Sequence, residues 1–157
     1  MSLQSFAGPM LVHPGTGRSA AIVCSEDFSG LKPVYLGGRR YVLLIVNSRP
    51  GTSVPVDVAR RWIDSGASYV CVWGPASHQL EEDFDYASFA PDCGGPLAFT
   101  LMTTAHGTEA LSETLWFAFY NATPPDDLNA ELDCVVIVVD SENAAEECEL
   151  WVKENAE

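Results

Sequence analysis

Tyr41-Val42-Leu43-Leu44-Ile45-Val46 is an unbroken apolar run with enough β-branched residues to form a strand. No charged residue interrupts it, which favours a central strand covered on both faces over an edge strand. Pro55–Ser65 then repeats apolar residues with the 3.6-residue period of a helix that lies on a sheet. Ser68–Trp73 is a second strand-like run. This strand–helix–strand order predicts a parallel βαβ unit.

The same alternation continues toward the C-terminus. We expect a strand over Leu97–Thr103, a helix over Thr108–Asn121, a strand over Cys134–Val139 and a helix over Asn143–Asn155. The connection Gly74–Pro96 is longer than usual, and its first half, Ser77–Phe89, predicts a further helix.

The N-terminal part predicts antiparallel strands. Gly37-Gly38 tolerates the positive φ angles of a tight turn, so Pro33–Leu36 and Tyr41–Asn47 are expected to form a hairpin. Ala20–Cys24 is expected to be a short edge strand, and residues 1–19 predict a loose, flexible arm.

Together these elements predict a single α/β domain over residues 20–157. Its architecture is expected to be a three-layer, flavodoxin-like sandwich with about four parallel strands plus an N-terminal antiparallel hairpin. The sequence does not determine the strand order.

Charge is distributed unevenly along the chain. The 157 residues include 22 acidic and 8 basic residues, which gives a formal net charge of −14. Between Trp62 and Val152 there are seventeen Asp and Glu residues and no Lys or Arg, and seven of the eight basic residues precede Trp62. Such a surface repels phosphate backbones and anionic lipids, which argues against nucleic-acid and membrane binding and favours a basic partner. Two alternatives are acidity that only maintains solubility and a charge dipole that drives head-to-tail self-association.

The five cysteines, an odd number at irregular spacing, indicate reduced thiols and not a disulfide framework. No Cys/His cluster suggests zinc and no phosphate loop ends in Lys, so we expect no cofactor. The strongest apolar run is too short to span a membrane, and the N-terminus lacks a signal-peptide pattern. A cytoplasmic monomer or homodimer is therefore expected.

Several unusual residues between about positions 56 and 140 share their order with a known family. They are Trp62-Ile-Asp-Ser-Gly66, Tyr69, Trp73-Gly74, Glu81-Glu82, Asp85, Ala87, Met102-Thr-Thr104, His106, Glu109, Leu111-Ser-Glu113, Trp116-Phe-Ala118, Asn121-Ala122 and Asp127-Leu128. On these residues the chain resembles a family of small uncharacterised bacterial α/β proteins. The resemblance implies a domain but no activity. It departs from the family pattern at Leu80-Glu-Glu82, Pro75-Ala-Ser77 and Ala105.

One candidate ligand site lies where the parallel strands are expected to end, because ligands bind beyond the carboxyl ends of open α/β sheets. The residues expected there are Trp73, Gly74, Thr103, Thr104, His106 and Glu109. His106 can act as an acid or base near neutral pH, and the hydroxyl groups can orient a small polar ligand. Alternatively, Thr104 and His106 cap the following helix while Trp73 packs in the core. The sequence assigns no catalytic residue.

Two weaker sites use other residues. His78, Glu82 and Asp85 would share one helix face and could hold a divalent cation, although a solvated acidic face explains them as simply. Cys93, on an expected loop, could pair with His106 as a nucleophile, but no basic residue near it in the sequence would activate the thiol.

The sequence thus supports two functional hypotheses. The first is a non-enzymatic acidic interaction module, of immunity or regulatory type, that binds a basic protein. Its surface would be built from acidic residues of three consecutive elements: Asp126, Asp127, Glu131, Asp133, Glu142, Glu146, Glu147 and Glu149. The alternative is a small-molecule-binding or hydrolytic α/β domain with its site around His106.

Overall fold

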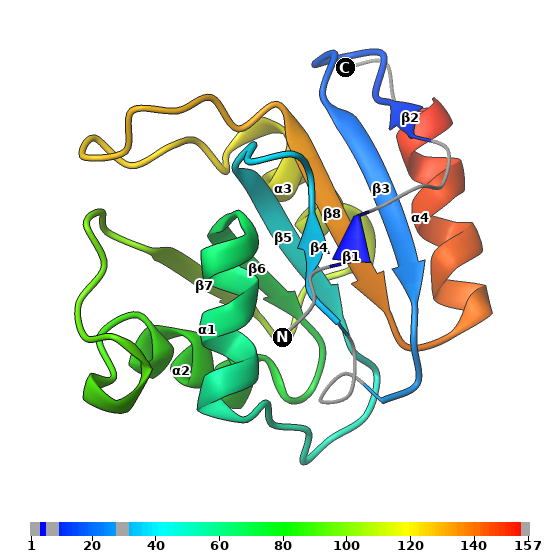
Figure 1. Ribbon diagram of the computed structural model, residues 1–157. Coiled ribbons are helices and arrows are strands. Elements are labelled where there is room, and N and C mark those ends of the chain that lie inside the picture. Colours follow the sequence, from blue (N-terminus) through cyan, green and yellow to red (C-terminus); the bar gives the residue numbers. More distant parts are fainter. Residues whose placement is uncertain (1–3, 6–9, 28–31, 155–157) are drawn as a thin grey trace.

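A six-stranded sheet between two layers of helices forms the fold (Figure 1). The computed structural model describes residues 4–5, 10–27 and 32–154. The strands lie in the order β2 (Leu11–Val12), β3 (Ser19–Cys24), β8 (Cys134–Val139), β5 (Tyr41–Val46), β6 (Ala67–Trp73) and β7 (Met102–His106). The helices are α1 (Val56–Ser65), α2 (Ser77–Ala87), α3 (Leu111–Tyr120) and α4 (Glu142–Glu154). The α/β, three-layer architecture expected from the sequence is confirmed.

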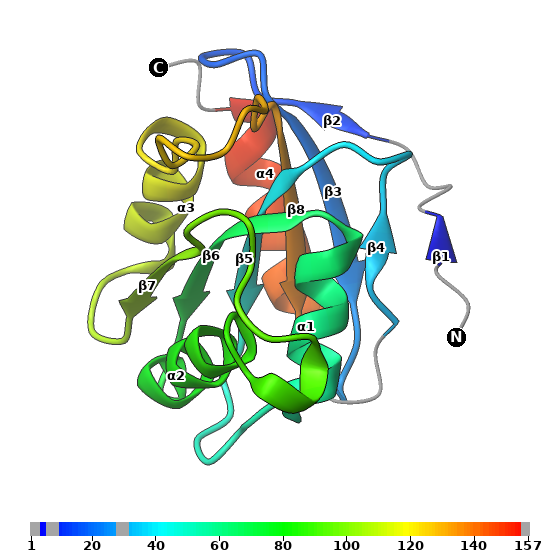
Figure 2. The same cartoon turned by 60° about the vertical axis from the view of Figure 1, so that its left-hand side comes forward.

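Alternate residues of the central strands face two separate cores. Leu43 and Ile45 pack in one core with α1 and α2. Val42 and Leu44 pack in the other core with α3 and α4 (Figure 2). Because both faces of β5 are covered, every one of its residues is buried, as the apolar run predicts.

The strand order places a topological switch point between β5 and β8. The strands β5, β6 and β7 follow one another across the sheet, and α1 and α2 connect them on one face. The chain then returns over the other face through α3 and adds β8 to the free edge of β5. The connections from β5 and β8 therefore leave toward opposite faces of the sheet, which is where α/β folds open a crevice.

Two N-terminal expectations are wrong. Ser19–Cys24 is not an edge strand: it pairs in parallel with β8 and antiparallel with β2, and so becomes a fifth parallel strand. The segment Val34–Tyr35 (β4) does not pair with β5, because β6 and β8 already occupy both edges of β5. It pairs instead with Gln4–Ser5 (β1). The turn itself is confirmed, with φ of 64° at Gly37 and 87° at Gly38.

The antiparallel hairpin is formed by β2 and β3, inside the segment expected to be a loose arm. His13 follows β2 and is fully buried, stacked on Trp151 with 5.1 Å between ring centroids and tilted against Phe119. Residues 11–19 are therefore part of the fold, while residues 1–3 and 6–9 lie outside the part of the chain that the structure describes.

The other expected elements are found, with two shifts: α3 begins at Leu111, three residues later than expected, and one strand is displaced. The strand expected over Leu97–Thr103 begins only at Met102, because Leu97, Phe99 and Leu101 pack sideways against the core beneath α1 and α2. The segment Gly74–Pro96 holds α2 and a short 3-10 helix, Pro91–Cys93. None of the helices in the described ranges has the length and apolar content that crossing a bilayer requires.

Candidate functional site

A hydrogen-bonded chain of side chains joins β7 to the start of α3. His106 is 7% exposed, and its ring nitrogens bond to Glu109 Oε1 at 2.9 Å and to Thr104 Oγ1 at 2.8 Å. The Trp73 indole N–H donates to the Glu109 carbonyl at 3.0 Å, and the Gly74 N–H donates to the His106 carbonyl. Five of the six residues expected at the strand ends are thus brought together.

The donors and acceptors in this chain can be assigned. An ionised Glu109 can only accept, so Nδ1 of His106 carries the proton and Nε2 accepts from the Thr104 hydroxyl. The Thr114 hydroxyl donates to the second Glu109 oxygen at 3.0 Å. Hydroxyl, imidazole and carboxylate therefore stand in the order used by hydrolytic triads. Burial raises the pKa of Cys71, which bonds to Thr104, to about 12, so its thiol remains protonated.

Thr103 is separated from this chain because successive strand residues point to opposite faces. Its hydroxyl donates to Asp85 Oδ1 at 2.7 Å, on the side of α2. Thr103 and Thr104 also lie within β7 and not beyond its end, since the strand starts later than expected.

The carboxyl ends of β5 and β6 are in close contact. A Cβ atom on Gly74 would lie 1.8 Å from the Asn47 carbonyl oxygen, and Gly74 has a φ of 121°. Only glycine fits this position. Its requirement comes from backbone packing and not from a ligand.

Asp140, directly after β8, lies at the topological switch point. Its Oδ2 accepts from the Ser48 amide at 2.8 Å and from the Ser48 hydroxyl at 2.9 Å. The residue is 8% exposed, and its Oδ1 is buried without a hydrogen-bond partner among the described residues. Asp140 was not among the residues predicted from the sequence, although its position directly after a fully apolar strand is a signal for this location.

The helix expected after Gly74 is confirmed as α2. The three residues considered as ligands of a divalent cation lie on it but do not meet at one point. His78 and Glu82 line an open pocket of about 630 Å³ beside Gly51 and Pro75. Asp85 lies one turn further and bonds to Thr103. Within the described ranges, no three His, Cys, Asp or Glu side chains converge as metal ligands would.

The pairing of Cys93 with His106 is wrong. Cys93 lines a pocket with Arg60 and Arg61 on the side of α1, whereas His106 contacts Phe117 of α3 on the opposite face of the sheet. The sequence also missed these two arginines as neighbours of Cys93, because they are more than thirty residues away in the chain.

A further pocket, of about 490 Å³, lies at the amino ends of β6 and β7, the edge opposite to the one expected from the sequence. Tyr69 and Met102 contribute from the strands, and the connection after α3 contributes the other side. The Pro124-Pro125-Asp126-Asp127 run lines it, and the sequence predicted Asp126 and Asp127 as part of an acidic surface and not as part of a pocket.

The chain matches one family model over residues 22–155, described as "Domain of unknown function (DUF7684)". The chain belongs to this family. No curated protein and no solved structure matches it. The resemblance to an uncharacterised α/β family is therefore confirmed at the level of the domain.

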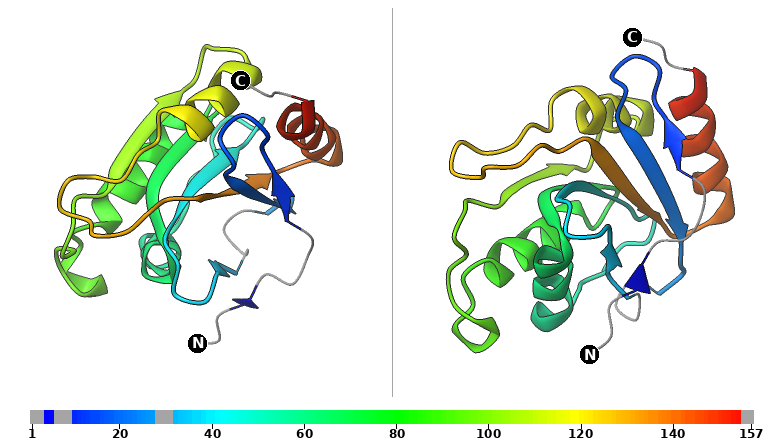
Figure 3. Two further views of the ribbon diagram at one scale, coloured as in Figure 1. Left: turned by 90° about the horizontal axis from the view of Figure 1, so that it is seen from above. Right: turned by 45° about the horizontal axis from the view of Figure 1, so that its top comes forward.

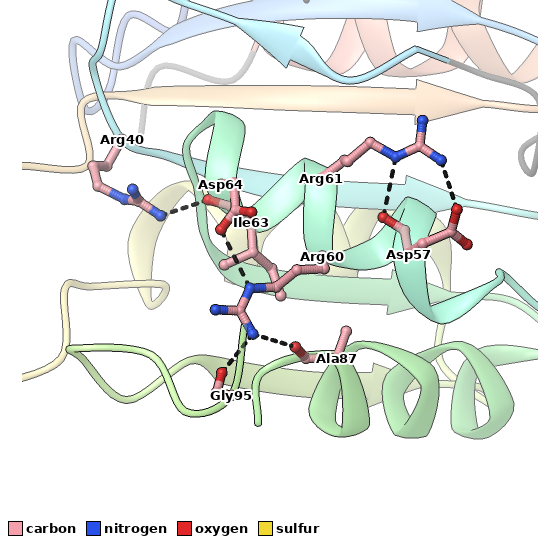
Figure 4. Close-up of polar contacts among 8 residues, drawn as sticks. All are labelled: Arg40, Asp57, Arg60, Arg61, Ile63, Asp64, Ala87 and Gly95. Atoms are coloured by element: carbon pink, nitrogen blue, oxygen red, sulfur yellow. Dashed lines mark hydrogen bonds and ion pairs between the residues drawn. The ribbon is translucent and has the colours of Figure 1, made fainter. Parts of the chain in front are cut away.

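All six arginines of the chain donate hydrogen bonds within it. Three of them bind carbonyl oxygens at helix C-termini, where a positive charge is favourable. Arg18 reaches Ala118 and Ala122 after α3, both at 2.8 Å. Arg40 reaches Ile63 near the end of α1 at 2.7 Å, and Arg60 reaches Ala87 at the end of α2 (Figure 4).

The remaining three arginines are also engaged. Arg39 and Arg61 form ion pairs with Asp133 and Asp57, and Arg49 binds the Glu26 carbonyl. The positive charge that the sequence concentrates before Trp62 therefore serves mainly to hold the fold together. Lys32, Arg39 and Arg49 are exposed nevertheless, so head-to-tail association through a charge dipole stays a prediction.

The eight acidic residues that the sequence predicted as one surface fall into two groups and not one continuous face. The connection from α3 to β8, with Asp126 and Glu131, projects from one side of the molecule, and α4 covers the other side (Figures 1 and 3). On α4, Glu142, Glu146, Glu147 and Glu149 are all exposed, and the neighbouring Leu150 is 56% exposed.

Proposed function

We propose that this domain is a cytoplasmic, non-enzymatic interaction module of bacterial type that binds a basic protein through its acidic surface. The observation that carries the proposal is that α4 exposes Glu142, Glu146, Glu147 and Glu149 and carries Lys153 as its one basic residue. The exposed carboxylates consequently have few cations near them, and their negative field extends into the solvent. Such a field accelerates association with a positively charged partner and excludes acidic ones.

The outer face of α4 is the surface that we propose for this contact. It combines the four glutamates around an exposed leucine with a helix whose inner face is fixed by the buried Cys148 and Val152. Among the described residues Lys153 pairs with Glu149 alone, at 3.6 Å, so within this part of the chain most of the negative charge on the helix has no ion-pair partner. A charged rim around an apolar side chain is the arrangement of an interface centre.

The test compares two variants with the same change in charge. The first replaces Glu142, Glu146, Glu147 and Glu149 on α4 by Gln. The control replaces four exposed carboxylates elsewhere, in Glu82→Gln, Asp92→Asn, Glu113→Gln and Glu131→Gln. Each protein is immobilised and exposed to a lysate of the native host at low and high salt.

We expect the wild type and the control to retain the same basic protein at low salt and to release it at high salt. The α4 variant should not retain this protein at either salt concentration. Retention of the same proteins by the α4 variant and the wild type would refute the proposal.

A hydrolytic function is the second candidate, favoured by the order of Thr104, His106 and Glu109 along one hydrogen-bonded chain. In this function Thr104 would be the nucleophile, His106 its base and Glu109 the group that orients the base. A fluorophosphonate probe, which bonds covalently to activated hydroxyl groups, tests this.

If the site is hydrolytic, the probe should label the wild type and the Thr103→Val variant. It should not label the Thr104→Val and His106→Gln variants. An unlabelled wild type, or a labelled Thr104→Val variant, would exclude this function.

A further inference from the structure

We propose that the pocket at the amino ends of β6 and β7 binds a cationic group, an ammonium or guanidinium, carried on a short apolar stem. This site is separate from the outer face of α4 and does not depend on the function proposed for that face. The supporting features are one hydroxyl without a partner in the protein, two carboxylates and an apolar wall.

The hydroxyl is that of Tyr69. The residue is 6% exposed and lines the pocket, and its hydroxyl group, which is not itself fully buried, forms no hydrogen bond with the described residues. The ring is held by an edge contact with Phe117, with 6.0 Å between centroids. Burial raises the pKa of Tyr69, so the phenol remains neutral. A fixed polar group without a partner, at the wall of a pocket, is a group that a ligand can satisfy.

Two carboxylates give the pocket its sign. Asp126 is exposed at the rim and has no ion-pair partner in the described ranges, and Asp127 lies beside it. Asp127 is held in place by the Thr100 amide and hydroxyl at 2.8 to 3.0 Å, and these hydrogen bonds lower the pKa of Asp127. No Lys, Arg or His lines the pocket. An anionic ligand would meet only repulsion, whereas a cation can bond to carboxylate and phenol oxygens together.

The opposite wall is apolar and rigid. Pro124 and Pro125 are half-buried and have fixed φ angles, and Met102 is 38% exposed on the strand across from them. Methylene groups pack well against such side chains. The volume of about 490 Å³ lies within the ~300–1,000 Å³ typical of ligand pockets. A ligand that joins an amine to a chain of several carbons meets both walls at once.

Two sources can supply this chemistry: a free aliphatic diamine or a Lys side chain of another protein. Titration calorimetry with the whole chain distinguishes them. The probes are 1,5-diaminopentane and N-acetyl-lysine methylamide, and the controls are 1,5-pentanediol and glutarate, which have similar stems without positive charge.

We expect at least one of the amines to bind and neither control to bind. Binding of the lysine derivative alone assigns the site to a protein side chain, and binding of the diamine alone assigns it to a small molecule. Tyr69→Phe and Asp126→Asn should each weaken the binding about tenfold, because each removes one hydrogen bond to a charged group. Asp92→Asn, an equal change in charge at an exposed residue elsewhere, should have no effect.

Tyr69→Phe removes a hydroxyl without a partner in the protein, so it should fold as the wild type does, and a melting temperature equal to that of the wild type would verify this. Equal binding of the diol and the amines, unchanged binding in Tyr69→Phe, or no binding of either amine would overturn the proposal. The α4 variant with four Gln residues should bind the amines like the wild type, so failure of one proposal does not imply failure of the other.

Discussion

Arg60→Ala should destabilise the protein far more than other truncations on the same helix. Arg60 is 9% exposed, and its guanidinium donates to the Ala87 carbonyl at 3.1 Å and to the Gly95 carbonyl at 2.6 Å. Each hydrogen bond from a charged donor contributes about 1.5–3 kcal/mol. Water can reach the Gly95 carbonyl in the variant and recover part of the loss, whereas the Ala87 carbonyl remains buried. The exposed partner Asp64 adds at most about 0.5 kcal/mol.

The expected loss is therefore about 3 kcal/mol, which for a chain of this length lowers the melting temperature by roughly 10 °C. Urea unfolding followed by circular dichroism at neutral pH measures it. Arg61→Ala is the matched control, because it removes the same charge from the adjacent position. The Arg61 guanidinium pairs with the exposed Asp57, so the expected loss is only about 0.5 kcal/mol.

Equal losses in the two variants would refute the reasoning. They would show that the internal hydrogen bonds of Arg60 do not contribute to stability. Arg60→Lys should lie between wild type and alanine, since an ammonium group cannot span both carbonyls as the guanidinium does.

Three further perturbations test other parts of the structure by the same unfolding measurement. Burial lowers the pKa of His13 from its ordinary value of 6.5, so on acidification the unfolded chain binds a proton at a higher pH than the folded protein, and the unfolding free energy should fall as the pH drops below about 6.5. His13→Gln should make the unfolding free energy less dependent on pH in this range, and the same pH dependence in the variant and the wild type would contradict the prediction. Gly74→Ala should cost more than about 3 kcal/mol or prevent folding, because its Cβ meets a carbonyl oxygen, while Gly51→Ala, in open space at positive φ, should cost about 1 kcal/mol. Asp140→Asn should remain within about 1 kcal/mol of wild type, because one amide oxygen preserves both accepted hydrogen bonds, whereas Asp140→Ala should lose about 2 kcal/mol; similar losses would refute this.

Most of the fold could be predicted because the buried strands are continuous apolar runs and the helices have clear periodicity. The run Cys134–Val139 and the helix after Pro55 were located within one or two residues. The pairing of short segments could not be predicted, since two residues such as Leu11–Val12 carry too little pattern. Their position is determined by which sheet edges remain free, and this is a property of the whole topology.

The candidate sites were less accessible to prediction, for a physical reason. Thr104, His106 and Glu109 lie within six residues of one another, so their proximity could be expected from the sequence. The pocket around Tyr69 joins residues up to fifty-eight positions apart, and only the strand order brings them together. The switch point at Asp140 likewise required the order of β5 and β8, which the sequence left open.

The arginines that bind carbonyl oxygens also determine how this chain responds to trypsin, which cleaves after Lys and Arg. Arg18, Arg40 and Arg60 are held against backbone at helix ends, so the folded protein should resist digestion at these bonds. Once it is unfolded, the enzyme finds no site between Arg61 and Lys153. Mass spectrometry of a tryptic digest will therefore detect this protein through short N-terminal peptides and one long acidic fragment, Trp62 to Lys153.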